Sequence, residues 1–174
     1  MSNLENAFFH LTHFPLIDSK HAELALNADY SEMLLYYNRG IQNSYAEAKE
    51  VSDSKLCRDL RGHFGECAAS YIKTNAMTGY DWHMDMSRKT CINILLVQPP
   101  GAQTLHKVNI NNLTYHLRVC DYKLFRPTVF NSTIPHCVIN PSNQDRYILT
   151  ISVGSLPRYE DLKNWAINYK IDSY

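Results

Sequence analysis

FNSTIPHCVINPSNQDRYILTISVG, residues 130–154, predicts two strands joined by a turn, and the rest of the fold can be worked out from it. Pro141–Asp145 is a cluster of turn-forming residues, and the apolar and β-branched residues after it predict a strand over 146–153. We expect this turn to fold the last strand back beside the strand that carries His136. Arg146 would then lie deep, on the wall of a cavity.

Short apolar or alternating runs continue upstream of this stretch. TCINILLV (90–97) is rich in β-branched residues and ends at the turn Pro99–Gly101, while Ile110–Leu113 has the composition of a tight hairpin. After that hairpin, apolar and polar residues alternate up to Val119. Eight strands are predicted in all: 69–76, 79–86, 90–97, 104–110, 113–119, 127–131, 135–139 and 146–153.

The first third of the chain and its tail have helical patterns. Asp29 and Glu32 form a capping box for a helix that ends at Gly40. A second helix is predicted to begin near Ser52 or Asp53 and to end before Gly65, and a third to cover 157–168.

Short strands between flanking helices indicate an α+β fold that is mainly β. We expect a jelly-roll core, that is a double-stranded β-helix, with the N-terminal helices packed on one sheet. A length of 174 residues suits a single domain over 1–174. Its expected parts are helical support over about 1–68, the jelly-roll core over about 69–154 and a C-terminal helix over about 157–168.

The composition narrows the range of partners. Lys and Arg number 17, as do Asp and Glu, so the net charge is zero, which argues against a broad nucleic-acid surface. No apolar run approaches the roughly 18 residues of a membrane span, and the N-terminus does not resemble a secretory signal. The five scattered cysteines favour reduced thiols in a cytoplasmic compartment.

His83 and Asp85 are the first part of a candidate metal site. They are one residue apart, so on an extended strand their side chains share a face. His136 would have to come from a strand that is distant in sequence and close in space. Two imidazoles and a carboxylate form the facial set that holds Fe(II) and leaves positions open for O2 and a co-substrate.

Arg146, ten residues after His136, is the second part of this pattern. A buried guanidinium without a partner is costly, so an anion is expected to meet it. That anion could be a bound carboxylate, held by the arginine's fork of donors, or a carboxylate of the chain itself.

The HMD at 83–85 together with 130–154 resembles the HxD…H…R signature of the Fe(II)/2-oxoglutarate-dependent dioxygenase superfamily. The resemblance covers about residues 70–154, roughly half the chain. The local sequence around these motifs is similar to that of the prolyl- and aspartyl/asparaginyl-hydroxylase-like branches. It implies that His83, Asp85 and His136 bind iron and that Arg146 binds the distal carboxylate of 2-oxoglutarate. It also implies hydroxylation of an amino-acid or peptidyl side chain with O2, releasing succinate and CO2.

Three more residues are weaker candidates. Asn93 and Tyr71, on the strands that flank the HxD, could contact the co-substrate; equally, Asn93 could serve a buried backbone group and Tyr71 could be a core aromatic. Arg88 could meet an acidic substrate or be a solvated loop charge. Thr150 and Ser152 share the face of Arg146 by alternation and could add a hydrogen bond. No catalytic side chain is predicted beyond the metal site.

The pattern departs from some branches of the superfamily. Ile148 stands where several small-molecule branches have a serine, and Ser152 stands where the nucleic-acid demethylases have a second arginine. Nucleic acid is therefore disfavoured as a substrate, which leaves an amino acid, a peptide or a small metabolite. The sequence does not define an oligomeric state.

Three competing interpretations remain at this stage. A cupin-type oxygenase would usually need HxH, but His106 and His116 do not form one. A zinc hydrolase with the same ligands would leave Arg146 without a purpose. A non-catalytic jelly roll that binds a metal or ligand, or acts as a scaffold, is the main alternative.

Overall fold

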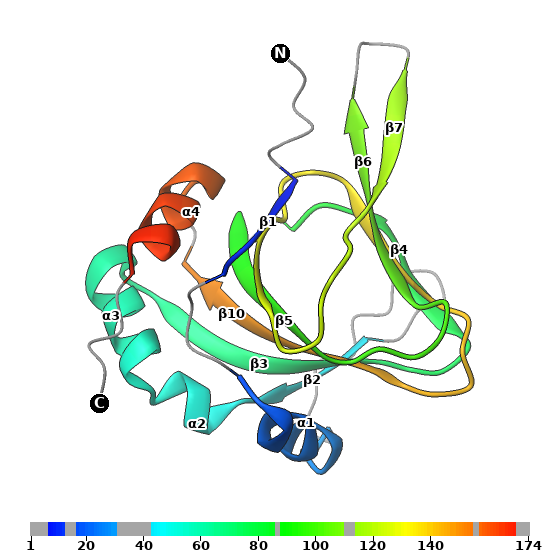
Figure 1. The fold of residues 1–174 in the computed structure, drawn as a ribbon, viewed down its shortest axis with the longest axis horizontal. Helices are drawn as coiled ribbons and strands as arrows, with labels where there is room; N and C mark the ends of the chain where they lie inside the picture. The colour runs from blue at the N-terminus through cyan, green and yellow to red at the C-terminus, as the bar shows by residue number, and fades with distance from the viewer. Residues whose placement is uncertain are drawn as a thin grey trace.

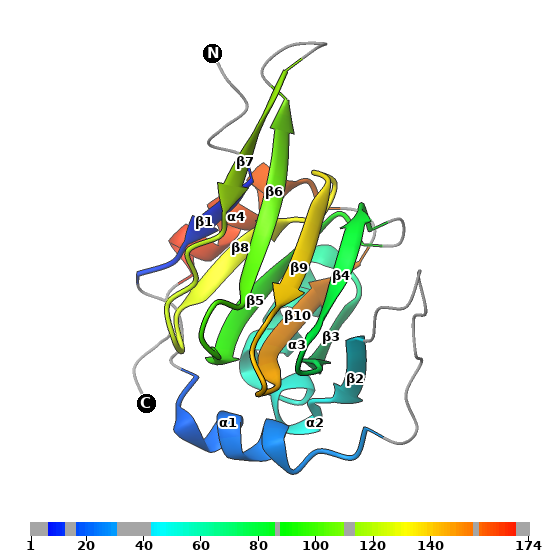
Figure 2. The ribbon, with the colours of Figure 1, turned by 90° about the vertical axis from the view of Figure 1, so that its right-hand side faces the viewer.

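Two antiparallel sheets make up the framework of the protein. The computed structural model describes residues 7–12, 17–30, 43–85, 88–109, 114–154 and 157–169. Figure 2 shows the smaller sheet in front of the larger one, with the strands of both running obliquely between the top and the bottom of the view. We refer to them as the large sheet and the small sheet.

The large sheet has six strands. Their spatial order is β1 (Phe8–His10), β8 (Pro127–Asn131), β5 (Thr90–Val97), β10 (Arg146–Val153), β3 (Cys67–Thr74) and β2 (Asn43–Glu47). The small sheet has the order β4 (Thr78–His83), β9 (His136–Asn140), β6 (Gln103–Asn109) and β7 (Tyr115–Val119). All eight strands predicted from the sequence are present, with bounds that shift by at most a few residues.

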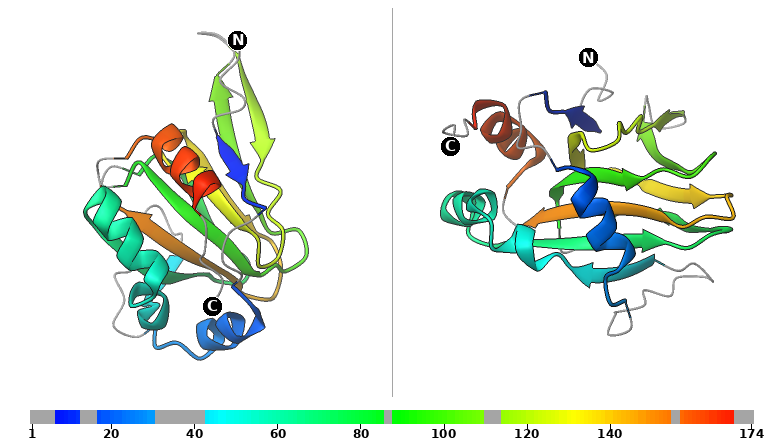
Figure 3. Two further views of the ribbon diagram at one scale, coloured as in Figure 1. Left: turned by 60° about the vertical axis from the view of Figure 1, so that its left-hand side comes forward. Right: turned by 60° about the horizontal axis from the view of Figure 1, so that its bottom comes forward.

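In the described part of the chain, four helices accompany the sheets: α1 (Ser19–Leu26), α2 (Lys49–Ser52), α3 (Lys55–Phe64) and α4 (Tyr159–Asn168). Figures 1 and 3 show them on the side of the large sheet that faces away from the small sheet. Alternate residues of β5 and β10, such as Ile94 and Leu149, are completely buried against helix residues such as Leu60 and Leu162. The predicted α+β class, mainly β with helices on one sheet, is confirmed.

Helix α3 shows how the sequence sets an element's ends. Ser54 is its N-cap, with a side chain that accepts a hydrogen bond from the Cys57 amide, and Gly65 ends it with a φ of +92°. Leu56 and Leu60 are buried on one face of the helix. It begins two to three residues later than predicted because Ser52 belongs to the short α2.

The N-terminal part differs from the prediction of helix alone. β1 and β2 lie within it as strands of the large sheet, and α1 begins after the N-cap Asp18, before the predicted capping box at Asp29. Residues 31–42, which hold most of the predicted helix, lie outside the described residues, as does the predicted hairpin at 110–113.

One predicted pairing is wrong. The turn after Asn140 does not place β10 beside β9, because β9 pairs with β4 and β6 in the small sheet and β10 pairs with β3 and β5 in the large sheet. The turn instead crosses from one sheet to the other. Arg146 still begins its strand deep in the molecule, facing the space between the sheets.

Candidate metal centre

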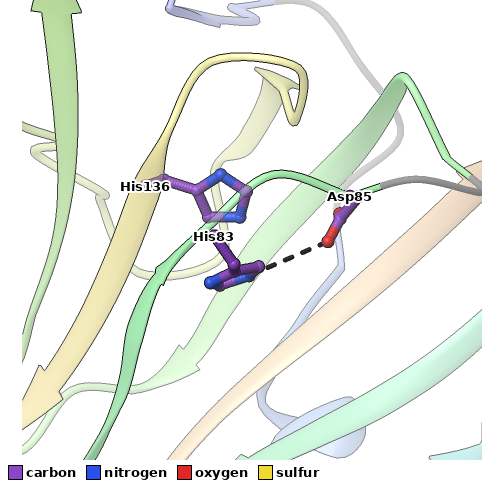
Figure 4. A group of neighbouring side chains, drawn as sticks. All are labelled: His83, Asp85 and His136. Carbon is purple, nitrogen blue, oxygen red and sulfur yellow. Dashed lines mark ion pairs between the residues drawn. The ribbon is translucent and has the colours of Figure 1, made fainter. Parts of the chain in front are cut away.

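His83, Asp85 and His136 come together at one end of the space between the sheets (Figure 4). His83 is the last residue of β4 and His136 the first of β9, and the two are register partners. Asp85 lies just past β4, where its backbone amide donates to the Ser132 carbonyl at 3.1 Å. One ligand atom from each of the three residues lies within 4.8 Å of the others. The structure thus brings the three predicted ligands to one point.

Both imidazoles are oriented by hydrogen bonds on their Nδ1 side. His83 Nδ1 lies 2.7 Å from the Asp81 carbonyl, and His136 Nδ1 lies 2.9 Å from the Ile134 carbonyl. A carbonyl accepts, so each Nδ1 carries the proton and each Nε2 is left with a free lone pair. The rings are also held by aromatic neighbours, Tyr80 against His83 and Phe130 against His136.

Burial keeps these histidines in the form that binds metals. It lowers the pKa of His136 to about 4, with the neighbouring His83 adding to the effect, and it lowers the pKa of His83 as well. Both imidazoles are therefore neutral at pH 7, as ligands must be.

The carboxylate of Asp85 is held by Arg88. Arg88 Nε and Nη2 both donate to Asp85 Oδ2, at 3.0 and 2.7 Å, while Asp85 Oδ1 lies 3.8 Å from His83 Nε2. Arg88 thus has a partner inside the site and is not the solvated loop charge that was one of its two predicted roles.

Arg146 is buried and only partly satisfied. Its exposed fraction is 1%, its Nε is a long 3.4 Å from Gln98 Oε1, and its Nη2 has no hydrogen-bond partner among the described residues. Within that part of the chain no carboxylate forms an ion pair with it, so the expected alternative of an internal salt bridge is not seen there. Burial lowers the pKa of this guanidinium, a cost that a bound anion would offset.

A single narrow cavity joins Arg146 to the three candidate ligands. Its volume is about 60 Å³, and its wall includes Asn93, Thr104 and Tyr122. Asn93 Nδ2 donates to the Tyr122 hydroxyl at 3.0 Å, and the buried Thr104 Oγ1 has no hydrogen-bond partner in the described structure. Asn93 therefore faces the cavity, as its predicted role requires.

Thr104 and Tyr122 were not found from the sequence. Thr104 lies two residues before His106, so alternation along β6 could have placed it on the inner face. Tyr122 comes from the irregular segment after β7, where no periodic pattern exists to indicate a direction.

Tyr71 does not reach this cavity. It is buried on the opposite face of the large sheet, in the core against the helices, and it lines a separate hollow of about 580 Å³ beside α1. Ile72 and Thr74 are the residues of β3 that face the cavity, so of the two roles left open for Tyr71 the structure agrees with the core aromatic and not with the co-substrate contact.

The donor set suits Fe(II) and 2-oxoglutarate. Two neutral imidazoles and one carboxylate match a facial iron site. The free Nη2 of Arg146 and the free Oγ1 of Thr104 are orphaned donors that a carboxylate could accept from. The cavity of about 60 Å³ places both of these donors and the three candidate ligands around one space. The hydrogen bond from Arg146 to Gln98 is long and therefore weak, so exchanging it for a bond to a bound carboxylate would cost little.

Comparison with solved structures gives the fold a context. A prolyl-4-hydroxylase from Pseudomonas putida aligns with a TM-score of 0.62 at 15% identity, over 85% of this chain and 92% of that one. A 2OG-Fe(II) oxygenase family protein from Burkholderia pseudomallei aligns with a TM-score of 0.61 at 11% identity, over 90% of this chain and 91% of that one. A Trichoplax adhaerens prolyl hydroxylase, solved with a hypoxia inducible factor peptide, aligns with a TM-score of 0.61 at 18% identity. The alignment covers 97% of this chain and 90% of that one.

The chain has the fold of the 2-oxoglutarate oxygenases. The predicted double-stranded β-helix and the resemblance to this superfamily are thereby confirmed at the level of the fold. No protein-family model matches the sequence, and no curated protein matches it. Among the described residues, no helix is long and apolar enough to cross a membrane.

Proposed function

We propose that this protein is an Fe(II)- and 2-oxoglutarate-dependent oxygenase that hydroxylates an amino-acid or peptidyl side chain. One observation carries the proposal: the same narrow cavity is lined by a two-histidine, one-carboxylate cluster and by a buried arginine with an unused donor. A non-catalytic metal-binding barrel would need the cluster but not the arginine.

Seven residues of the cavity have a part in this proposal. His83, Asp85 and His136 hold the iron and leave positions open toward the cavity. Arg146 binds the distal carboxylate of 2-oxoglutarate, and Thr104 donates a further hydrogen bond to it. Asn93 and Tyr122, hydrogen-bonded to each other, form the wall that keeps the co-substrate in one orientation.

Iron with its bound co-substrate supplies the oxygen chemistry, in which R–H, 2-oxoglutarate and O2 become R–OH, succinate and CO2. The protein orients the reactants and keeps water away from the buried end of the cavity, where Arg146 is 1% exposed. A peptide substrate is favoured because the Trichoplax structure holds a peptide on the same fold.

The chemistry of the cysteines supports a reducing, cytoplasmic location. All five are buried and none is in a disulfide. We therefore expect activity to persist in strong thiol reductants.

The test is an oxygen-free titration of 2-oxoglutarate into the Fe(II)-loaded protein. Binding is monitored by the visible charge-transfer band of the chelate. Arg146→Ala is expected to weaken co-substrate binding at least about 30-fold, because a buried charge pair lost on one side costs 2 kcal/mol or more. Arg126→Ala, which removes an exposed arginine, is the matched control and keeps the wild-type titration.

Succinate release in air, against free amino acids and proline-containing peptides, then identifies the substrate class. Iron binding without a band contradicts the co-substrate part of the proposal and favours a metal-binding scaffold. Failure to bind iron contradicts the metal site itself.

A further inference from the structure

Arg88 holds one particular oxygen of Asp85. Both of its donor nitrogens on this side, Nε and Nη2, point to Oδ2, and neither contacts Oδ1. Oδ1 is the oxygen that lies nearer to the candidate ligand His83, at 3.8 Å from its Nε2. The two oxygens of this carboxylate therefore have different surroundings before any metal binds.

The other end of the guanidinium is fixed to the large sheet. Arg88 Nη1 donates to Thr150 Oγ1 at 3.0 Å and to Ser152 Oγ at 3.3 Å, and both hydroxyls belong to β10. These are the two residues that alternation placed on the inner face of that strand. Arg88 thus links the large sheet to Asp85.

The backbone groups of Asp85 and Arg88 are also held. Arg88 O accepts a hydrogen bond from the completely buried Ser132 at 2.6 Å, and Asp85 N donates to Ser132 O. Asp85 and Arg88 therefore stay at a fixed distance from each other. A rigid fork that donates to one oxygen has less freedom to release it than a flexible lysine would have.

We propose that Arg88 is a positioning residue that restricts Asp85 to one-oxygen coordination of the metal. A carboxylate can bind a metal through one oxygen or through both, and the second oxygen would take a further coordination position. With two histidines and one Asp85 oxygen, an octahedral ion keeps three open positions. With both oxygens it would keep two.

The number of open positions on the metal determines whether one is left for O2 beside the co-substrate. This step of the inference rests on the proposed function. A chelating 2-oxoglutarate takes two positions, so the third is the one left for O2. Arg88 thus preserves the oxygen position by occupying Asp85 Oδ2, without itself touching substrate or co-substrate.

The test counts waters on bound Mn(II), a redox-stable stand-in for Fe(II), from water-proton relaxation at saturating metal. Arg88→Met frees Oδ2, so the relaxation enhancement per Mn(II) is expected to fall by roughly one third, as three bound waters become two. Arg88→Leu, equally neutral and without a hydrogen-bond donor, is measured in the same way in case the methionine variant does not fold.

Arg58→Met is the matched control, because it removes an exposed arginine on α3. It is expected to keep the wild-type relaxation, which shows that loss of one positive charge is not the cause. Thermal denaturation of each variant confirms that the count refers to folded protein.

The outcomes separate this inference from the proposed function. Wild-type relaxation in the Arg88 variants overturns the role of Arg88 and leaves the metal site and the proposed function intact. Failure of the wild type to bind Mn(II) contradicts the metal site and with it both proposals.

Discussion

His106 is a buried histidine that the candidate site does not use. Its exposed fraction is 0%, neither ring nitrogen has a hydrogen-bond partner among the described residues, and it packs between Phe8 and Phe130. Burial lowers its pKa to about 3. Such a residue contributes to packing as a small aromatic ring, while its polar atoms cost stability.

The burial of neutral His106 makes the free energy of unfolding depend on pH. In the unfolded chain His106 takes up a proton below about pH 6.5, whereas in the folded protein it stays neutral until about pH 3. The unfolded state therefore binds more protons in between, and stability falls as the pH falls through this window. From pH 7.5 to 5.5 the loss from this one residue is about 1.4 kcal/mol.

We predict that His106→Leu removes this part of the acid sensitivity. Leucine has a similar volume and no polar atoms to desolvate, so the variant is expected to be at least as stable at pH 7.5 and about 1.4 kcal/mol less sensitive to the change to pH 5.5. Urea denaturation of both metal-free proteins at the two pH values measures the difference. An equal loss in both proteins would contradict the burial of a neutral His106.

The single residues of the site show what a sequence can and cannot reveal. His83, Asp85, His136 and Arg146 were found because their chemistry and order are informative, and the structure brings them to one cavity. Two roles stay open for Tyr71 in the sequence because the segment of β3 around it, AASYI, has small or apolar residues on both faces, so the pattern does not distinguish them.

At the scale of elements, the approach of β4 to β9 sets the geometry of the two histidines. A Cβ built on Gly79 of β4 would lie 2.6 Å from the Val138 carbonyl oxygen of β9, which real side chains essentially never do. Only glycine lets the two backbones come this close. Because β4 ends at His83 and β9 begins at His136, this contact bears on the metal site.

We predict that Gly79→Ala separates the two strands. Stability should fall by about 1–3 kcal/mol, and Mn(II) affinity should fall with it, since the two imidazoles move apart. Gly62→Ala in α3 is the control: nothing lies within 4 Å of its Cβ, so a gain of roughly 0.5–1 kcal/mol with unchanged Mn(II) affinity is expected. Urea midpoints and competition with a chromophoric chelator measure both quantities. Wild-type affinity in the Gly79 variant would show that the strands tolerate the methyl group.

Strands were easier to predict than their partners. Alternating and β-branched runs mark eight of the ten strands found among the described residues, but a period of two gives only the faces of a strand and says nothing about its neighbours. This is why β10 was expected beside β9, when the turn between them crosses to the other sheet. In β7 the pattern was right and the apolar face is about half exposed, with Tyr115 at 49% and Leu117 at 56%.

At the scale of the whole molecule, the candidate site joins the two sheets. The histidine ligands belong to the small sheet, whereas Arg146 and Asn93 belong to the large sheet. The sequence predicted the two-sheet fold because the count and spacing of strands suffice for it. It could not predict the full wall of the cavity, because part of that wall is Tyr122, which comes from an irregular segment without a periodic pattern.

A ligand that bridges two sheets should stabilise them together. Metal binding to the folded state alone adds about 2.7 kcal/mol at a concentration 100 times its dissociation constant, and a co-substrate that binds the metal and Arg146 at once adds a second increment. We predict that Mn(II) raises the melting temperature and that 2-oxoglutarate raises it further only when Mn(II) is present. In Arg146→Ala the increase caused by Mn(II) should remain, and most of the increase caused by 2-oxoglutarate should be lost. Thermal denaturation with each ligand alone and with both tests this order. If 2-oxoglutarate stabilises the metal-free protein as strongly, it binds without the metal, and the two ends of the cavity do not act on one ligand.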